Sequence, residues 1–258
     1  MTTEDRDHTS LVEPDAVGSR SSHAAKKKHL PVWQETILLL AVALVLAVVI
    51  KALFVQAFYI PSESMEPGLV KNDRILVQKV SYWLGGTPQR GDVVVFQDPG
   101  DWLGPEESAG PQGGITKLMA NIGLYPSGGH LVKRVIGVAG DTIECCDEEG
   151  RISVNGKPLN EKDYVKQTGA ECNGPMIGCS WSAGPVPEGH LFVMGDNRAH
   201  SADSTVHLCT KSETDCVPGD EYVANDLVVG KVFLLLWPSD RFKFVHRPDT
   251  FADVPDPS

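Results

Sequence analysis

The sequence predicts a mainly β fold, in which a single N-terminal transmembrane helix is followed by an antiparallel β domain. Two observations lead to this prediction. Leu30 to Ile50 form an almost wholly apolar run. Beyond residue 73 the chain contains short β-branched segments bounded by Gly, Pro or Asp, a pattern typical of strands and turns. A composition with 25 Gly and 18 Pro among 258 residues also favours a turn-rich β domain over a largely helical one.

Residues 1–29 are polar and end in the basic cluster Lys26 to Lys28. They contain too little apolar surface to offset the entropy lost on ordering, so we expect a flexible tail. Because basic residues beside a span stay in the cytoplasm, this tail is expected to be cytoplasmic and the chain beyond Lys51 extracytoplasmic. The predicted localisation is the cell membrane, with a single pass.

The apolar run Leu30 to Ile50 has the length of one membrane span. At about 1.5 Å per residue it extends about 31 Å, close to the hydrocarbon thickness of a bilayer. We expect the anchor to occupy residues 30–58. A buried core helix is a second interpretation, although apolar residues cover every face rather than one stripe. A cleavable signal peptide, cut near Val55-Gln56-Ala57, is a third.

The extracytoplasmic part is acidic. The whole chain has a net charge of -11, and residues 59–258 alone carry 17 basic and 28 acidic groups. An acidic chain does not have the basic surface of a nucleic-acid binder, so we expect no nucleic-acid partner. We expect the extracytoplasmic β domain to span residues 59–247, with an insertion at 98–129, and residues 248–258 to be a flexible C-terminal tail.

Several elements of the β domain can be placed by pattern. Asn155-Gly156 between two short β segments indicates a hairpin. The middle of the insertion, from Ile115 to Ile122, has apolar residues at helical spacing. The apolar run 232–237 ends at Pro238 and predicts a buried strand. The expected strands are residues 74–80, 92–96, 131–137, 151–154, 190–194 and 227–233.

All six cysteines lie in the expected extracytoplasmic domain, which favours disulfides. The simplest local pairs are Cys172/Cys179 and Cys209/Cys216, with other pairings open. Cys145 and Cys146 are adjacent, and since neighbours on a strand alternate faces, we expect them to reach different partners. A zinc site is the competing interpretation, but the usual Cys and His spacings are missing, so no metal site is predicted.

Two segments contain candidate catalytic groups. Ser62 and Ser64 lie between Pro61 and Pro67, only 11 to 13 residues beyond Lys51. A serine nucleophile needs a base, and no histidine lies in a recognisable triad motif. Lys133, in the strand 131–137, is an alternative base, provided that it is neutral near pH 7 to 8, which apolar burial favours. Either Lys133 or Arg134 is expected to be buried because they lie on opposite faces of one strand.

A third segment, residues 195–204, follows the strand 190–194. It is rich in groups that bond to the backbone and to one another. Most such loops are structural. This one could also supply a hydroxyl that orients the lysine.

Together the three segments resemble the bacterial type I signal peptidases, membrane-anchored serine proteases that use a Ser-Lys dyad. The resemblance covers roughly residues 30–240. The matching motifs, in order, are Pro61-Ser62-Glu63-Ser64-Met65-Glu66-Pro67, then Lys133-Arg134-Val135-Ile136-Gly137 with Gly140-Asp141, then Gly195-Asp196-Asn197-Arg198 through Ser201, Asp203 and Ser204.

The resemblance implies an endopeptidase that removes signal peptides from secretory precursors at Ala-x-Ala-like sites, without a cofactor. Ser64 would be the nucleophile and Lys133 the general base, Ser62 would contribute to the oxyanion hole, and Ser201 would orient the lysine. Thr205 stands where the family usually has an arginine. Structural support is implied for Asp196, Asn197, Arg198 and Asp203. Substrate-pocket positions are implied for Phe58, Ile60, Pro61, Met65, Leu131 and Val132.

Two other functions remain open. One is a membrane-anchored, disulfide-stapled binding module without catalysis, in which Ser64 is ordinary loop and Lys133 lies on the surface. The other is a self-cleaving regulator related to the SOS repressors, which share a Ser-Lys dyad and a similar β scaffold. That function needs a cytosolic DNA-binding domain, which we do not expect in this acidic chain.

Overall fold

The computed structural model describes residues 31–82, 85–100, 102–104, 114, 129–167, 178–209 and 216–257. The apolar run forms helix α1 (Val32–Phe54), whose 23 residues extend about 34 Å. Its 18-residue segment Val32–Val49 has a mean hydropathy of 2.3, and none of it is buried. The helix therefore has the length and composition of a span and is not a buried core helix.

The helix ends earlier than the predicted anchor boundary at residue 58. Val55–Tyr59 form strand β1, which pairs antiparallel with β2 (Arg74–Gln78) from Val55 opposite Gln78 to Tyr59 opposite Arg74. The side chains alternate between buried and less buried, with Gln56 and Phe58 inward. Hydropathy alone extends the predicted anchor to residue 58, because a half-buried strand such as β1 is also apolar on average.

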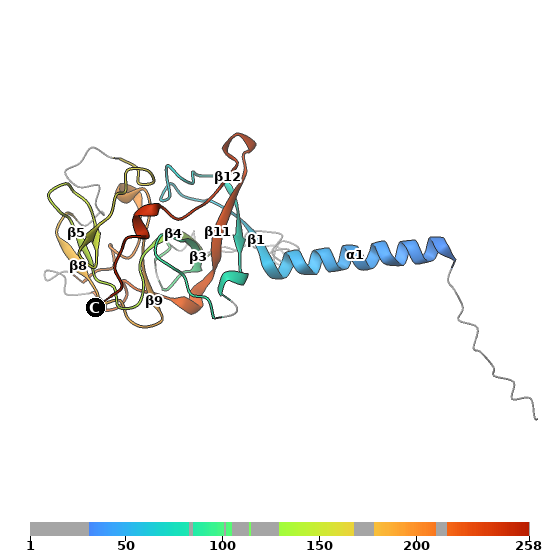
Figure 1. The fold of residues 1–258 in the computed structure, drawn as a ribbon, viewed down its shortest axis with the longest axis horizontal. Coiled ribbons are helices and arrows are strands. Elements are labelled where there is room, and N and C mark those ends of the chain that lie inside the picture. Colours follow the sequence, from blue (N-terminus) through green and yellow to red (C-terminus); the bar gives the residue numbers. More distant parts are fainter. Residues whose placement is uncertain are drawn as a thin grey trace, which may run out of the picture. The chain divides into compact units, whose positions relative to one another are not determined.

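The larger sheet has the strand order β1–β2–β11–β3–β4–β9–β10, with β12 paired to β11 (Figure 1). Each of its pairings is antiparallel, which confirms the predicted fold class. Its remaining strands are β3 (Val93–Gln97), β4 (His130–Gly137), β9 (His190–Met194), β10 (Val223–Ala224), β11 (Val228–Trp237) and β12 (Lys243–Phe244). All six segments predicted as strands from β-branched runs contain an observed strand.

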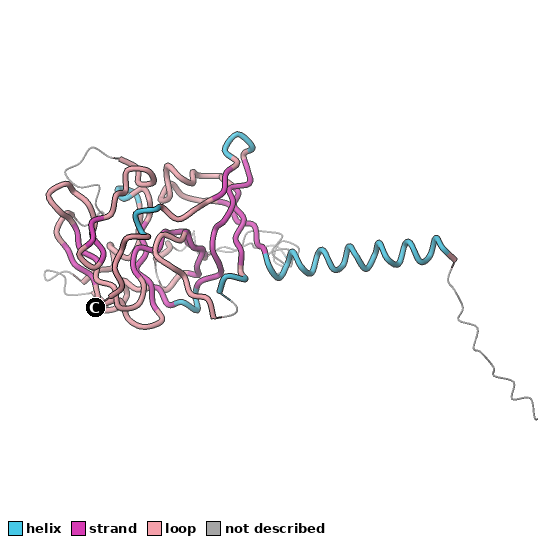
Figure 2. Tube along the Cα trace, in the orientation of Figure 1, coloured by secondary structure: helices cyan, strands magenta, loops and turns pink. Residues whose placement is uncertain are grey.

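A smaller sheet has the order β7–β6–β5–β8. Its strands are β5 (Ile143–Cys145), β6 (Ser153–Val154), β7 (Lys157–Pro158) and β8 (Trp181–Ala183). The predicted hairpin joins β6 to β7, and both turn residues, Asn155 and Gly156, have positive φ, as a type I′ turn requires. Between these strands run long irregular segments, drawn pink in Figure 2. Short 3₁₀ helices lie at Val80–Tyr82, Arg198–His200, Asn225–Leu227, Ser239–Arg241 and Asp249–Phe251.

Residues 248–257 differ from the predicted flexible tail. Phe251 and Val254 are buried in the apolar cluster that also contains Ile143 and Phe192. The Pro255 carbonyl accepts a hydrogen bond from Asn155 at 2.9 Å. The composition of this segment resembles a loop because only two apolar side chains anchor it, which is too few for a periodic pattern.

The structure changes two other expectations. Strand β11 reaches Trp237 as predicted, but Leu236 and Trp237 are exposed rather than buried. Cys145 and Cys146 are bonded to each other, not to different partners. Strand β5 ends at Cys145, so the alternation of neighbouring strand residues does not extend to Cys146.

The other disulfide expectations have different outcomes. The expected Cys209–Cys216 disulfide is present. Cys179 is disulfide-bonded, but Cys172 lies outside the described residues, so their pairing stays a prediction. The helix expected at 115–122 also lies outside them.

Candidate active site

The segment with the two serines follows β1 and turns back toward β2. Its turn is closed by hydrogen bonds from the Glu66 N–H to the Glu63 carbonyl at 3.1 Å and from the Leu69 N–H to the Met65 carbonyl at 2.9 Å. Ser64 is 6% exposed, and its Oγ lies 3.2 Å from the Oγ of Ser62. The two hydroxyls are therefore adjacent, and the one predicted as nucleophile is buried.

Lys133 lies in β4, a strand paired on both edges, with β3 and β9. It pairs with Val94 and is 4% exposed. By strand alternation its face carries Leu131 and Val135, which belong with Val94 to one apolar cluster. The neighbouring Arg134 is also buried. The sequence predicts that one of these two cations is buried, and the structure shows that both are buried.

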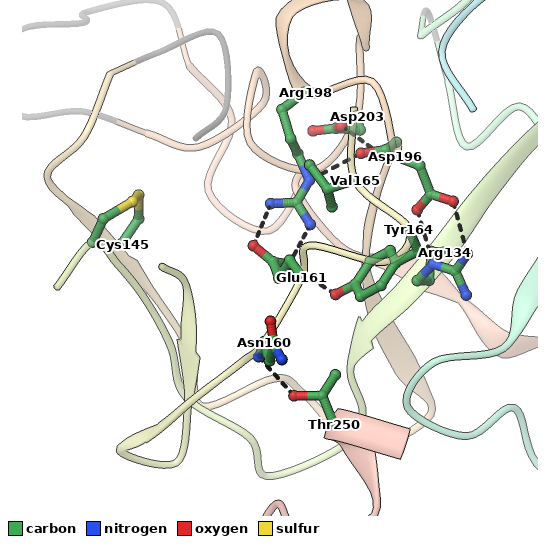
Figure 3. A network of polar contacts seen from close by, with 12 residues as sticks. Arg134, Cys145, Asn160, Glu161, Tyr164, Val165, Asp196, Arg198, Asp203 and Thr250 are labelled. Carbon is green, nitrogen blue, oxygen red and sulfur yellow. Dashed lines mark hydrogen bonds and ion pairs between the residues drawn. A yellow bond between two sulfur atoms is a disulfide. The ribbon is translucent and has the colours of Figure 1, made fainter. Parts of the chain in front are cut away.

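Arg134 links β4 to the loop that follows β9 (Figure 3). Its guanidinium donates to both carboxylate oxygens of Asp196, at 2.8 and 2.7 Å, and to the Gly91 carbonyl at 2.9 Å. Burial alone would lower the pKa of Arg134, but the charge and hydrogen bonds of Asp196 outweigh burial and raise it. The pair therefore fixes the residue after Lys133 to the loop.

The next residue of this loop contacts the serine segment directly. The Asn197 N–H donates to the Ser64 carbonyl at 2.9 Å, and its side-chain amide donates to the Glu63 carbonyl at 3.1 Å. Two consecutive loop residues, Asp196 and Asn197, thus bond to β4 on one side and to the Ser64 peptide on the other. The three predicted motifs meet at this point.

Gly195 lies where the loop is most crowded. A Cβ at this position would be 2.3 Å from Ser201 Oγ and 2.5 Å from the Ser64 carbonyl oxygen. Both distances are too short for any side chain. Ser201 therefore lies close to the backbone of the predicted nucleophile, and glycine is required between them.

Asp203 is buried and accepts four hydrogen bonds. On Oδ2 it accepts from Ser201 Oγ at 2.5 Å and the Gly195 N–H at 2.8 Å; on Oδ1 it accepts from the N–H and Oγ1 of Thr205, at 3.1 and 2.7 Å. In the described parts of the chain no cation pairs with it. Thr205 thus bonds to the carboxylate where the family pattern has an arginine.

Sequence reasoning missed two residues that support this loop, Glu161 and Tyr164. The guanidinium of Arg198 donates to both oxygens of Glu161, at 3.1 and 2.5 Å, and the Tyr164 hydroxyl donates to the same carboxylate at 2.8 Å (Figure 3). The Arg134 guanidinium lies 4.6 Å from the Tyr164 ring centroid. A polar stretch such as residues 160–163 looks like an exposed loop, and its ion-pair partner is 37 residues away, so no local signal identifies it.

The six residues expected to line a substrate pocket do not share one environment. Phe58, Ile60, Met65 and Val132 are buried in a single apolar cluster, whereas Leu131 belongs to the cluster that contains Val94. Pro61 is exposed. Their role in substrate binding stays a prediction. Among the described residues, no group of three or more His, Cys, Asp or Glu side chains is placed to hold a metal ion.

Comparison with known families identifies the chain. The family model described as signal peptidase, peptidase S26, matches residues 33–237. The chain belongs to this family. The match extends from the apolar helix to the end of β11, so it includes all three predicted motifs. The chain is therefore an enzyme of the signal peptidase family, and the alternative of a binding module without catalysis is not supported.

Curated relatives agree with the family match. Signal peptidase I of Mycobacterium tuberculosis H37Rv is 38% identical over 250 residues, covering 90% of this chain and 84% of that protein. A probable signal peptidase I of Mycobacterium leprae is 35% identical, covering 84% and 80%. Signal peptidase I of Leptolyngbya laminosa is 32% identical, covering 84% and 86%. The solved signal peptidase I of Enterococcus faecalis V583 is 22% identical, covering 56% and 95%, with a TM-score of 0.30.

Proposed function

We propose that this enzyme removes signal peptides from secretory precursors at Ala-x-Ala-like sites, with Ser64 as nucleophile and Lys133 as general base. One observation supports the proposal above the others. Asp196 and Asn197 connect the strand of Lys133 to the peptide of Ser64 through bonds of 2.7 to 3.1 Å. A dyad drawn from distant segments needs such a connection to hold its geometry.

In the proposed reaction, neutral Lys133 accepts the proton of Ser64 while Oγ attacks the scissile carbonyl carbon. The carbonyl oxygen of the tetrahedral intermediate accepts hydrogen bonds from the Ser62 hydroxyl and the Ser64 N–H. The C–N bond then breaks, the leaving amine takes the proton from Lys133, and an ester to Ser64 remains. Water, deprotonated by Lys133, hydrolyses this ester and regenerates the enzyme.

The burial of both groups supports this chemistry. Ser64 and Lys133 are 6% and 4% exposed, so bulk water has little access to either. By strand alternation Lys133 shares its face of β4 with Leu131 and Val135, which belong to one apolar cluster. An extended precursor segment would bind along an exposed strand edge, with small side chains entering pockets lined by Phe58, Ile60, Pro61, Met65, Leu131 and Val132.

The test uses the full-length enzyme in detergent, incubated with a secretory precursor, with the new N-terminus mapped. Ser64→Ala and Lys133→Ala are expected to lose cleavage while remaining folded by circular dichroism. The matched controls are Ser182→Ala and Lys157→Ala, both at exposed positions, which are expected to cleave normally. Substantial turnover by either site variant would overturn the assignment.

We also propose that α1 spans the membrane once, with the Lys26 to Lys28 cluster in the cytoplasm and the β domain outside. The length of α1, its mean hydropathy and the positive-inside rule support this topology. Protease added to the outside of intact cells stripped of their wall is expected to digest the β domain. Protection of the β domain, with digestion only after lysis, would reverse the topology.

A further inference from the structure

The hydrogen bonds around Asp203 determine where the proton of Ser201 lies. Asp203 Oδ2 is bonded to the Gly195 N–H and to Ser201 Oγ, and Oδ1 to the Thr205 N–H and Oγ1. In these bonds both hydroxyls, those of Ser201 and Thr205, donate to the carboxylate. The single proton of Ser201 is therefore directed at Asp203.

A hydroxyl whose proton is already donated can only accept from its other neighbours. Ser201 then presents its oxygen lone pairs to the site near the Ser64 carbonyl, where Gly195 leaves no room for a side chain. An accepting Ser201 fits an amine that donates one N–H to it and directs its own lone pair elsewhere. This is the arrangement that a lysine general base requires.

Thr205 determines how well Asp203 can serve as the acceptor. The carboxylate is 1% exposed, and in the described residues it has hydrogen-bond donors around it but no paired cation. A buried carboxylate without a paired cation depends on the hydrogen bonds that it accepts for its stabilisation. Thr205 supplies two of the four, through its N–H and its hydroxyl. Only the hydroxyl can be removed by substitution.

We propose that Thr205 is a positioning residue of this enzyme, which acts through Asp203 to fix Ser201 as a hydrogen-bond acceptor for the catalytic amine. The inference rests on the proposed function, since it assigns Lys133 as that amine. In this chain the neutral hydroxyl of Thr205 donates to Asp203 at the position where the family pattern has an arginine. The proposed consequence is kinetic: the chemical step depends on the Thr205 hydroxyl, whereas substrate binding does not.

The experiment measures kcat and KM of the full-length enzyme on a precursor peptide. Thr205→Val keeps the shape and removes the hydroxyl, and it is expected to lower kcat about tenfold with KM unchanged within about twofold. Thr205→Ser restores the hydroxyl and is expected to restore kcat to within about twofold of the wild type. Ser204→Ala is the matched control, because Ser204 Oγ accepts from the Val193 N–H and is not among the groups that donate to the Asp203 carboxylate.

A double-mutant comparison separates positioning from folding. In a Ser201→Ala background, Thr205→Val is expected to cause no further loss, since its effect passes through Ser201. An equal tenfold loss in both backgrounds, or a wild-type kcat for Thr205→Val, would overturn the proposal. Thr205→Ala, measured in the same way, replaces Thr205→Val if the latter unfolds at the assay temperature. Failure of the proposed function is distinguishable, because Ser64→Ala and Lys133→Ala would then remain active.

Discussion

The carboxylate of Asp196 accepts two hydrogen bonds from the guanidinium of Arg134, at 2.8 and 2.7 Å, with both side chains buried. Removing one partner of a buried ion pair leaves the other charge uncompensated. The pair also fixes the residue beside Lys133 to the loop that bonds to Ser64. Stability and activity therefore depend on the same contact.

Asp196→Asn is expected to lower stability by about 3 to 5 kcal/mol, which lowers the midpoint of thermal unfolding by roughly 10 °C. Glu66→Gln is the control, because the Glu66–Lys166 pair is partly exposed and screened by solvent, so its loss is expected to change the midpoint little. Equal midpoints for the two variants would show that the Arg134 pair contributes no more than a surface pair.

The Glu161 carboxylate is expected to contribute more to stability than the Tyr164 hydroxyl that donates a hydrogen bond to it. Glu161→Gln weakens the compensation of the buried Arg198 charge, at a cost of about 3 kcal/mol or more, whereas Tyr164→Phe removes one hydrogen bond worth about 1 kcal/mol. Chemical denaturation of both variants checks the order. A larger loss for Tyr164→Phe would contradict it.

Gly195→Ala is expected to reduce precursor cleavage more than about 100-fold, since a methyl group would overlap Ser201 Oγ and the Ser64 carbonyl. Gly104→Ala is the matched control, because a Cβ there meets nothing within 4 Å. Near-normal cleavage by Gly195→Ala would mean that the two segments can separate without affecting the reaction.

Phe251→Ala is expected to destabilise the β domain by about 3 to 5 kcal/mol, since it empties a buried site in the core. Phe242→Ala removes the same side chain at a position that is 52% exposed and is expected to change stability by about 0.5 kcal/mol or less. Comparable thermal midpoints for the two variants would indicate that residues 248–257 are dispensable to the core.

His207 makes stability depend on pH. Burial lowers its pKa, although the carboxylates of Asp220, Asp203 and Asp98 oppose this shift. The unfolded chain therefore binds a proton at His207 more readily than the folded chain does. Stability should fall as pH drops below the unfolded value of about 6.5 and level off above it.

His207→Phe can still stack on Trp102 but cannot titrate, so its thermal midpoint should change less between pH 5 and pH 7.5 than that of the wild type. Exposed His246 supplies the control variant, His246→Phe. An unchanged pH dependence in His207→Phe would assign the effect to other groups.

The predictions of the helix, the main strands and the hairpin rest on strong local patterns in the sequence. The helix has a continuous apolar composition, the main strands have β-branched runs, and the hairpin has Asn155-Gly156. The smaller elements carry no comparable signal, because β5, β8 and β10 have only two or three residues each and depend on neighbouring strands.

The candidate site likewise has parts with a local sequence signal and parts without one. Its three motifs were visible in the sequence, but their supports come from elsewhere in the chain. Glu161 pairs with Arg198, which is 37 residues away in the sequence, so no local pattern identifies it. In a polar stretch, the sequence of a buried carboxylate does not differ from that of an exposed one. The environment of Asp203 likewise depends on Gly195, eight residues earlier, whose backbone N–H has no sequence signature.

The two disulfides whose ends are both described, Cys145–Cys146 and Cys209–Cys216, join residues one and seven positions apart. Crosslinks this short restrict an unfolded chain only locally. A thiol reductant acting on them would relax the chain around Cys145 and Cys209 and leave the ladder of paired strands joined by its own backbone bonds. On this basis, the integrity of the domain under reducing conditions depends on its packing and not on these sulfur bonds.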